Sequence, residues 1–89
     1  MKAVITVTAK DGVGIIAKVS NACAEHGANI LDIAQSVLGD YFAMIMLVNV
    51  DNLKIPFCDF VDFMSDLGKK NNLHIDTMHE DVFNSMHRV

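Results

Sequence analysis

The sequence of 89 residues predicts an α+β fold, in which a four-stranded antiparallel sheet carries two helices on one face. Two observations lead to this prediction. Four stretches show the alternation or the apolar runs that are typical of strands, and two longer stretches repeat apolar residues at helical spacing. Their order is strand, helix, strand, strand, helix, strand, which folds as a split βαβ arrangement. We therefore expect residues 1–89 to form one domain.

The first third of the chain predicts a strand and a helix. Residues Lys2–Ala9 alternate, and the face that contains Ala3 and Ile5 is expected to meet the helices. Residues Val13–His26 predict an amphipathic helix that ends at Gly27, where a left-handed C-cap is expected. Its buried stripe is expected to comprise Ile16, Val19, Cys23 and His26, with Ile15 and Ala22 beside it.

The middle of the chain predicts a β-hairpin. Two strands, Asn29–Leu38 and Tyr41–Val50, flank Gly39-Asp40, which fits a two-residue turn. The second of these strands is apolar on both faces until Asn49. A strand of this kind is central in its sheet, and we expect something to cover its second face.

The last third predicts a helix, a strand and a short helical tail. Pro56 suits the first turn of a helix that ends within residues 68–72. Leu73–Met78 predicts the final strand, and Glu80–His87 could add a turn or two of helix. Thr77 stands at capping-box spacing from the first residue of that tail, so it is expected to cap it.

Composition excludes several partners. The net charge is −4 and the only arginine is Arg88, so nucleic acid and acidic membrane surfaces are not expected to bind. No apolar run is long enough to cross a membrane and no leader segment is visible, which indicates a cytoplasmic protein in which Cys23 and Cys58 are reduced thiols. A hydrophobic content of 52% predicts self-association.

The segment Lys10–Ile16 is the candidate site, because two glycines stand where the first strand ends and the first helix begins. Backbone N–H groups at a helix start have no partner inside the helix and attract anions such as a carboxylate. Alternatively, Gly12 and Gly14 only shape a tight turn. No nucleophile or acid pair accompanies them, and His74 and His79 have no metal-ligand spacing, so neither an enzyme, a metal site nor a cofactor is expected.

Two motifs then point to a family. Asp-Gly-Val-Gly at residues 11–14, Gly-Ala-Asn-Ile at residues 27–30 and the element order together resemble the ACT domain family. The likeness covers nearly the whole chain and is greatest to small stand-alone ACT proteins, a group similar to the ACT half of glycine-cleavage regulators. It implies a ferredoxin-like βαββαβ fold with, here, a short C-terminal helix. Val13 stands where many amino-acid-binding members have proline.

The resemblance implies a regulatory homodimer that binds a small amino acid and signals to a separate enzyme or transcription factor. The ligand carboxylate would meet the helix start, and Asp11 and Asn29 would contact its ammonium group; Asp11 could equally be a turn or N-cap residue. ACT ligands commonly lie between two copies, so the residues of the second strand would come from the partner. The implied ligand-binding residues are Asp11, Gly12, Val13, Gly14, Ile15, Asn29 and Ile30.

Three other classes of protein are alternatives to an amino-acid sensor, and the first two share this element order. An acylphosphatase would need an arginine in the first loop, which has none. An RNA-binding domain would need basic and aromatic residues on its central strands, and the run around Tyr41 and Phe42 lacks Lys and Arg. A protein interaction module that binds no small ligand is the strongest alternative. The dimer could form by edge strands or by stacked open faces, and the residues leave both open.

Overall fold

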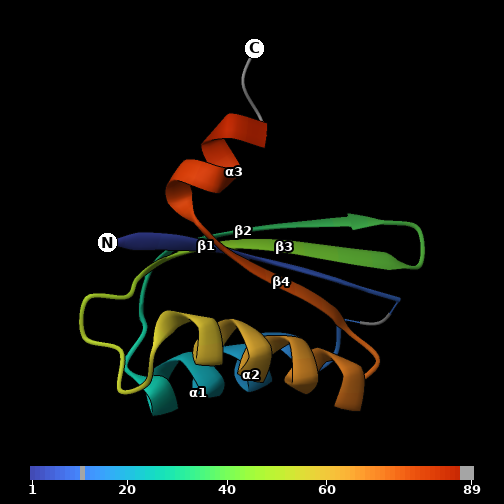
Figure 1. The fold of residues 1–89 in the computed structure, drawn as a ribbon. Coiled ribbons are helices and arrows are strands. Elements are labelled where there is room, and N and C mark those ends of the chain that lie inside the picture. The colour runs from blue at the N-terminus through green and yellow to red at the C-terminus, as the bar shows by residue number, and fades with distance from the viewer. Residues whose placement is uncertain (11, 87–89) are drawn as a thin grey trace.

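The computed structural model describes residues 1–10 and 12–86 and confirms the predicted α+β architecture (Figure 1). Four strands and three helices follow one another in the described part of the chain. Their bounds are β1 Lys2–Ala9, α1 Ile15–His26, β2 Asn29–Leu38, β3 Tyr41–Asn49, α2 Phe57–Lys70, β4 His74–His79 and α3 Glu80–Met86. None of these helices is long and apolar enough to span a membrane.

The four strands form one antiparallel sheet in the order β2-β3-β1-β4. Strand β3 is central, as its two-sided apolar sequence predicts. Ile5 lies opposite Met46 of β3 on one side and Thr77 of β4 on the other. The pairing of β2 with β3 contains one irregularity, between Ile30 and Asp32. Strand β2 is an edge of the sheet in the described residues.

Helices α1 and α2 cover one face of the sheet and enclose the core (Figure 1). Alternate residues of β1 and β3 point into this layer, and the inward face of each helix meets them. Burial of such apolar side chains contributes about 1.5–3 kcal/mol each. The largest fully buried side chains are Phe60, Ile5, Met44, Met46, Met64, Val7, Val19, Val48 and Cys23.

The helix starts differ from the predictions by one or two residues. Helix α1 begins at Ile15 and not at Val13, because Gly14 adopts a left-handed conformation with φ of 73° that no helix interior allows. Ile15 is therefore buried, whereas Ile16, which was expected on the buried stripe, is 38% exposed. Pro56 is the N-cap residue of α2 and does not lie in its first turn, since its ψ of 149° is extended.

Helix α3 lies on the opposite face of the sheet from α1 and α2 (Figure 1). The expectation that Thr77 caps this helix is wrong. Thr77 lies within β4, opposite the inward-facing Ile5, and its buried hydroxyl has no hydrogen-bond partner among the described residues. It therefore faces the layer of α1 and α2, on the side of the sheet away from α3. The tail is helical as far as Met86, and His87 lies outside the described residues.

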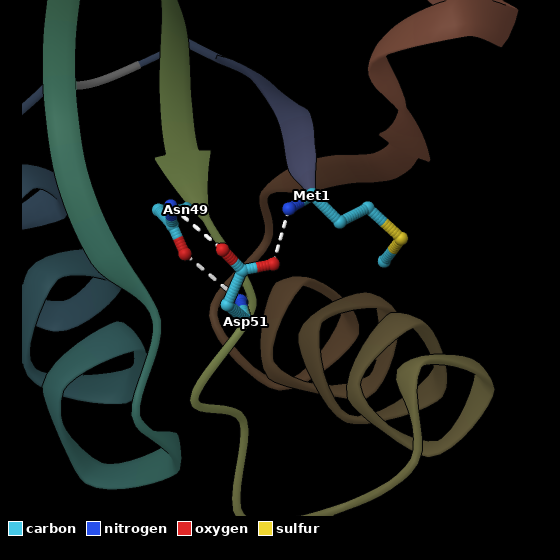
Figure 2. A network of polar contacts seen from close by, with 3 residues as sticks. All are labelled: Met1, Asn49 and Asp51. Atoms are coloured by element: carbon cyan, nitrogen blue, oxygen red, sulfur yellow. Dashed lines mark hydrogen bonds and ion pairs between the residues drawn. The ribbon is translucent and has the colours of Figure 1, made fainter.

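A polar network holds the start of β1 to the end of β3 (Figure 2). The N-terminal ammonium group of Met1 donates a hydrogen bond to a carboxylate oxygen of Asp51. The amide of Asn49 donates to the other oxygen at 3.3 Å, and the Asp51 N–H donates to the Asn49 side-chain oxygen at 2.8 Å. The hydrogen bond from the ammonium group, followed by that from Asn49, lowers the pKa of Asp51.

Candidate functional site

The first turn of α1 forms the centre of the candidate site. Its N-cap residue is Gly14, which has no side chain to accept a hydrogen bond from the helix amides. The N–H of Lys18 donates to the Gly14 carbonyl at 3.1 Å, and that of Ile15 makes a long contact of 3.4 Å with the Gly12 carbonyl. The first turn contains no acidic residue. No side chain of the described residues therefore caps this helix end.

The two glycines of the segment have separate roles. A Cβ atom on Gly12 would lie 2.9 Å from Cδ1 of Phe42, so this glycine lets the loop pack against the core. A Cβ atom on Gly14 would meet nothing within 4 Å, and it is the positive φ that favours glycine there. Close packing on Phe42 therefore explains Gly12, and the turn conformation explains Gly14, where the position of a Cβ atom remains open.

A hollow of about 260 Å³ adjoins this helix end, between the β1–α1 loop and the α2–β4 loop. Lys10 and Lys18 supply positive charge to its wall, and Val13, with a side chain 84% exposed, stands at its rim. Positive side chains and a helix N-terminus both favour an anion. The full lining is Ala9, Lys10, Val13, Ile15, Lys18, Asn71, Asn72 and Leu73.

Six of the eight lining residues were not among the predicted ligand-binding residues. Lys18 lies outside the predicted buried stripe of the first helix, and Asn71 and Asn72 lie where the second helix is predicted to end. A sequence signal exists for Lys18, because it follows Gly14 by four positions and long helical side chains lean toward the helix N-terminus. For Lys10 the signal is its place inside the candidate segment. The approach of the α2–β4 loop to this end of the molecule has no local signal.

The structure does not bring the two halves of the predicted site together within one copy. Asn29 and Ile30 follow the C-terminal end of α1, while Gly12, Val13, Gly14 and Ile15 lie at its N-terminal end. A helix of 12 residues is about 18 Å long. Asn29 and Ile30 line a separate hollow of about 420 Å³ with Ser20, Ala24, Gly27 and Ala28. Asp11 lies outside the described residues.

The remaining chemistry-bearing side chains form no second cluster in residues 1–10 and 12–86. No group of three or more His, Cys, Asp or Glu there is arranged to hold a metal ion. Cys23 is buried, which raises the pKa of its thiol to about 11 and keeps it protonated. Cys58 is exposed on α2. His26 packs edge-on against the ring of Phe63, with a centroid distance of 4.2 Å.

Comparison with known proteins agrees with this architecture. A family model described as ACT domain matches residues 2–58. A UPF0237 protein of Clostridium perfringens is 45% identical over 89 residues, which cover the whole of both chains. The solved structure of an ACT domain protein from Streptococcus pneumoniae superposes with a TM-score of 0.82 and 41% identity over 93% of each chain.

A solved structure described as a putative glycine cleavage system transcriptional repressor has the same fold. The TM-score is 0.70 at 24% identity, over 89% of this chain and 47% of that one. This chain thus corresponds to about half of the repressor, as the resemblance in sequence implied. The matched residues contain both motifs that flank α1, Asp-Gly-Val-Gly and Gly-Ala-Asn-Ile. The chain belongs to the ACT domain family.

Proposed function

We propose that this protein is a cytoplasmic regulatory domain that binds a free amino acid as a homodimer and signals to a separate protein. ACT domains are typically regulatory and bind ligands, and the described residues offer an anion site without a nucleophile beside it. The ligand and the dimer are both part of the proposal. The regulated protein is an enzyme or a transcription factor, and the domain itself has no catalytic role.

The N-terminal end of α1 is the observation that carries the proposal. No side chain within residues 1–10 and 12–86 caps the first helical amides, and Lys10 and Lys18 line the hollow in front of them. An α-carboxylate would accept hydrogen bonds from free amides of this turn, such as that of Ile16, and would neutralise the lysines. The volume of about 260 Å³ limits the occupant to a small molecule.

The ammonium group of the ligand would be held from two sides. We assign one contact to the Asp11 carboxylate, which belongs to the same loop, and one to the side-chain oxygen of Asn29. Asn29 and Ile30 must come from a second copy, because in one copy the length of α1 separates them from Gly14. The site is then complete only in the dimer.

The sheet provides a route to such a dimer. Strand β2 runs parallel to β1, since both are antiparallel to β3, so it ends on the side where α1 begins. Antiparallel pairing of two β2 edges would place the partner's strand start beside that end. Strand β2 has ten residues, most of them exposed, and no proline or lysine to block such pairing.

Complementation between two defective variants tests the shared site. Gly14→Asp places a carboxylate where the ligand carboxylate would bind, and aspartate tolerates the left-handed conformation and caps helices well. Asn29→Ala removes the partner's contact. Each variant alone should bind poorly. After subunit exchange of an equal mixture, half of the dimers contain one copy of each variant. Each of these mixed dimers has one intact site out of two, so about a quarter of the wild-type number of sites should return.

The experiment uses isothermal calorimetry with a panel of twenty amino acids, and then the ligand that binds the wild-type protein. Gly39→Asp is the control, because Gly39 has the same left-handed conformation, with φ of 60°, and open space at the hairpin turn. It should bind as the wild type does. Failure of the mixture to regain sites would show that one copy holds the whole site. If no amino acid binds the folded wild-type protein, the protein interaction module without a ligand is the correct function.

A further inference from the structure

The face of the sheet away from α1 and α2 is partly bare and apolar. Strand β3 presents Tyr41, Ala43, Ile45 and Leu47 to this face, because its alternate residues are buried in the core. Tyr41 is 62% exposed and Ile45 is 46% exposed. Strand β1 adds Val4, Thr6 and Thr8 in register with them. We call this surface the open face.

Helix α3 covers one end of the open face and leaves apolar side chains exposed. None of its residues is buried. Phe83 lines a hollow of about 440 Å³ with Val4, Ile45 and Leu47 at the end of the sheet where β1 begins. Val82 and Met86, four positions apart, are 49% and 65% exposed. Figure 1 shows α3 rising away from the sheet.

The surface area of the chain exceeds that of a compact monomer. The accessible surface is 5610 Å², whereas a folded monomer of 9.8 kDa exposes about 5200 Å². The excess of about 400 Å² is half of what one partner buries in a standard interface, about 800 Å².

Charge is distributed unevenly along the open face. The first turn of α3 contains Glu80 and Asp81 at one end. At the other end, a second hollow of about 440 Å³ is lined by residues that include Lys10, Tyr41 and His74. His74 also contacts Asp76 on the same strand at 3.0 Å. The acidic helix and the hollow with Lys10 are therefore at opposite ends of one face.

We propose that the open face binds the open face of a second copy, with each α3 lying on the end that the other copy leaves bare. A two-fold axis parallel to the sheet and perpendicular to its strands exchanges the two ends. It brings Val82 and Met86 of each copy to Tyr41 and Ile45 of the other, and Glu80 toward Lys10. Each copy thus contributes both its α3 and the bare end of its open face to the contact.

This contact goes beyond the proposed function, because it needs neither a ligand nor the β2 edge. If both contacts form, the chain is a tetramer. Disrupting the open face then leaves a dimer that still binds its ligand. If only the open-face contact forms, the same disruption converts a dimer into a monomer. The two proposals therefore fail separately, and the molecular mass distinguishes them.

Sedimentation velocity of the full chain at micromolar concentration tests the contact. Ile45→Lys and Met86→Lys place charge in the middle of the proposed interface, on residues that are already exposed. Each should halve the assembly mass without changing the circular dichroism spectrum. Cys58→Lys is the matched control, since Cys58 is exposed on α2 in the other layer, and it should keep the wild-type mass. Unchanged mass in both folded test variants would overturn the proposal.

Cysteine cross-linking identifies the occupant directly. In a Cys58→Ser background, the double variant Tyr41→Cys with Val82→Cys should form disulfide-linked dimers upon treatment with diamide, and each single variant should form fewer. The pair Asp62→Cys with Val82→Cys is the control, since Asp62 is exposed on α2 in the other layer, and it should give the background level. Absence of cross-links above that level, in a chain that sediments as a monomer, would show that a different protein covers the open face and would contradict the proposal.

Discussion

The two ends of α1 differ although both are flanked by a glycine in the left-handed conformation. Gly14 has φ of 73° and Gly27 has φ of 81°. At Gly27, the protein's own atoms occupy the helix end: the Gly27 N–H donates to the Ala24 carbonyl at 3.3 Å and the Ala28 N–H to the Cys23 carbonyl at 2.8 Å. At Gly14, the Ile15 N–H donates to the Gly12 carbonyl at 3.4 Å, and no side chain of the described residues caps the remaining amides.

The surroundings of the two glycines differ in the same way. A Cβ atom on Gly27 would lie 2.4 Å from the backbone oxygen of Asn52, so the β3–α2 loop closes that end. The His26 carbonyl accepts a hydrogen bond of 2.9 Å from the Lys54 N–H of the same loop. A Cβ atom on Gly14 would meet none of the described residues beyond its chain neighbours within 4 Å, and a hollow adjoins this end. A glycine with positive φ thus stands at both ends of α1, but the end at Gly27 is covered by the β3–α2 loop and the end at Gly14 faces a hollow.

Gly27→Ala should produce the largest loss of stability. The methyl group meets backbone and not a movable side chain, and alanine is strained at positive φ, so we expect a loss of about 3 kcal/mol or more. The free energy of unfolding from urea denaturation measures it. A loss below 1 kcal/mol would show that the β3–α2 loop moves away easily and that the closed end is not rigid.

High pH should reduce stability through Cys23, whose carbonyl belongs to the closed end. Burial raises the pKa of its thiol from 9.0 to about 11, so the folded state retains a proton that the unfolded state releases. Stability is therefore complete below pH 9 and falls by about 2–3 kcal/mol as the pH approaches 11. Cys23→Ala should remove this part of the dependence, as urea titrations at pH 8 and pH 10.5 would show.

Gly14→Ala should have a smaller effect than Gly27→Ala, because only backbone strain opposes it. We expect a loss of about 1–2 kcal/mol, the typical cost of the left-handed conformation for an alanine. Urea denaturation under the conditions used for Gly27→Ala gives the comparison. Equal losses in the two variants would mean that the two ends are equally closed and would refute the contrast between them.

Asp51→Asn should give the smallest loss of stability. Asp51 hydrogen-bonds to Met1 and Asn49 where β3 ends (Figure 2). The pKa of this carboxyl is lowered, so its contribution is present above the ordinary carboxyl pKa and is lost as the pH falls through the lowered value. The difference between variant and wild type in urea midpoint should be small at pH 7 and absent at pH 2. A difference that persists at pH 2 would point to a cause other than this ion pair.

The sequence predicted the elements well because their signals are local. The alternation in Lys2–Ala9, the helical spacing after Pro56 and the Gly39-Asp40 turn depend only on neighbours along the chain. The prediction for Thr77 was wrong because its spacing from Glu80 has another structural basis. The Thr77 spacing matched a capping box, but Thr77 belongs to β4 and faces the core, so its hydroxyl cannot reach the start of α3.

The candidate site was less predictable because it depends on contacts that are distant in sequence. The Gly12–Ile15 segment could be found from its glycines, and it lies at a helix end as expected. That Asn29 and Ile30 lie at the other end of α1 follows from the length of the helix, and whether a second copy brings them back depends on assembly. The approach of Asn72 to the hollow depends on the packing of α2 beside α1, which no local pattern encodes.

The central claim is that the open end of α1 binds a small carboxylate. Calorimetric titration of wild type, Gly14→Asp and Gly39→Asp with the amino acid panel tests it most directly, with thermal melts to confirm folding. We predict binding by the wild type and by Gly39→Asp, and loss of binding in Gly14→Asp although its α1 remains capped and folded. Undiminished binding by folded Gly14→Asp would contradict the claim.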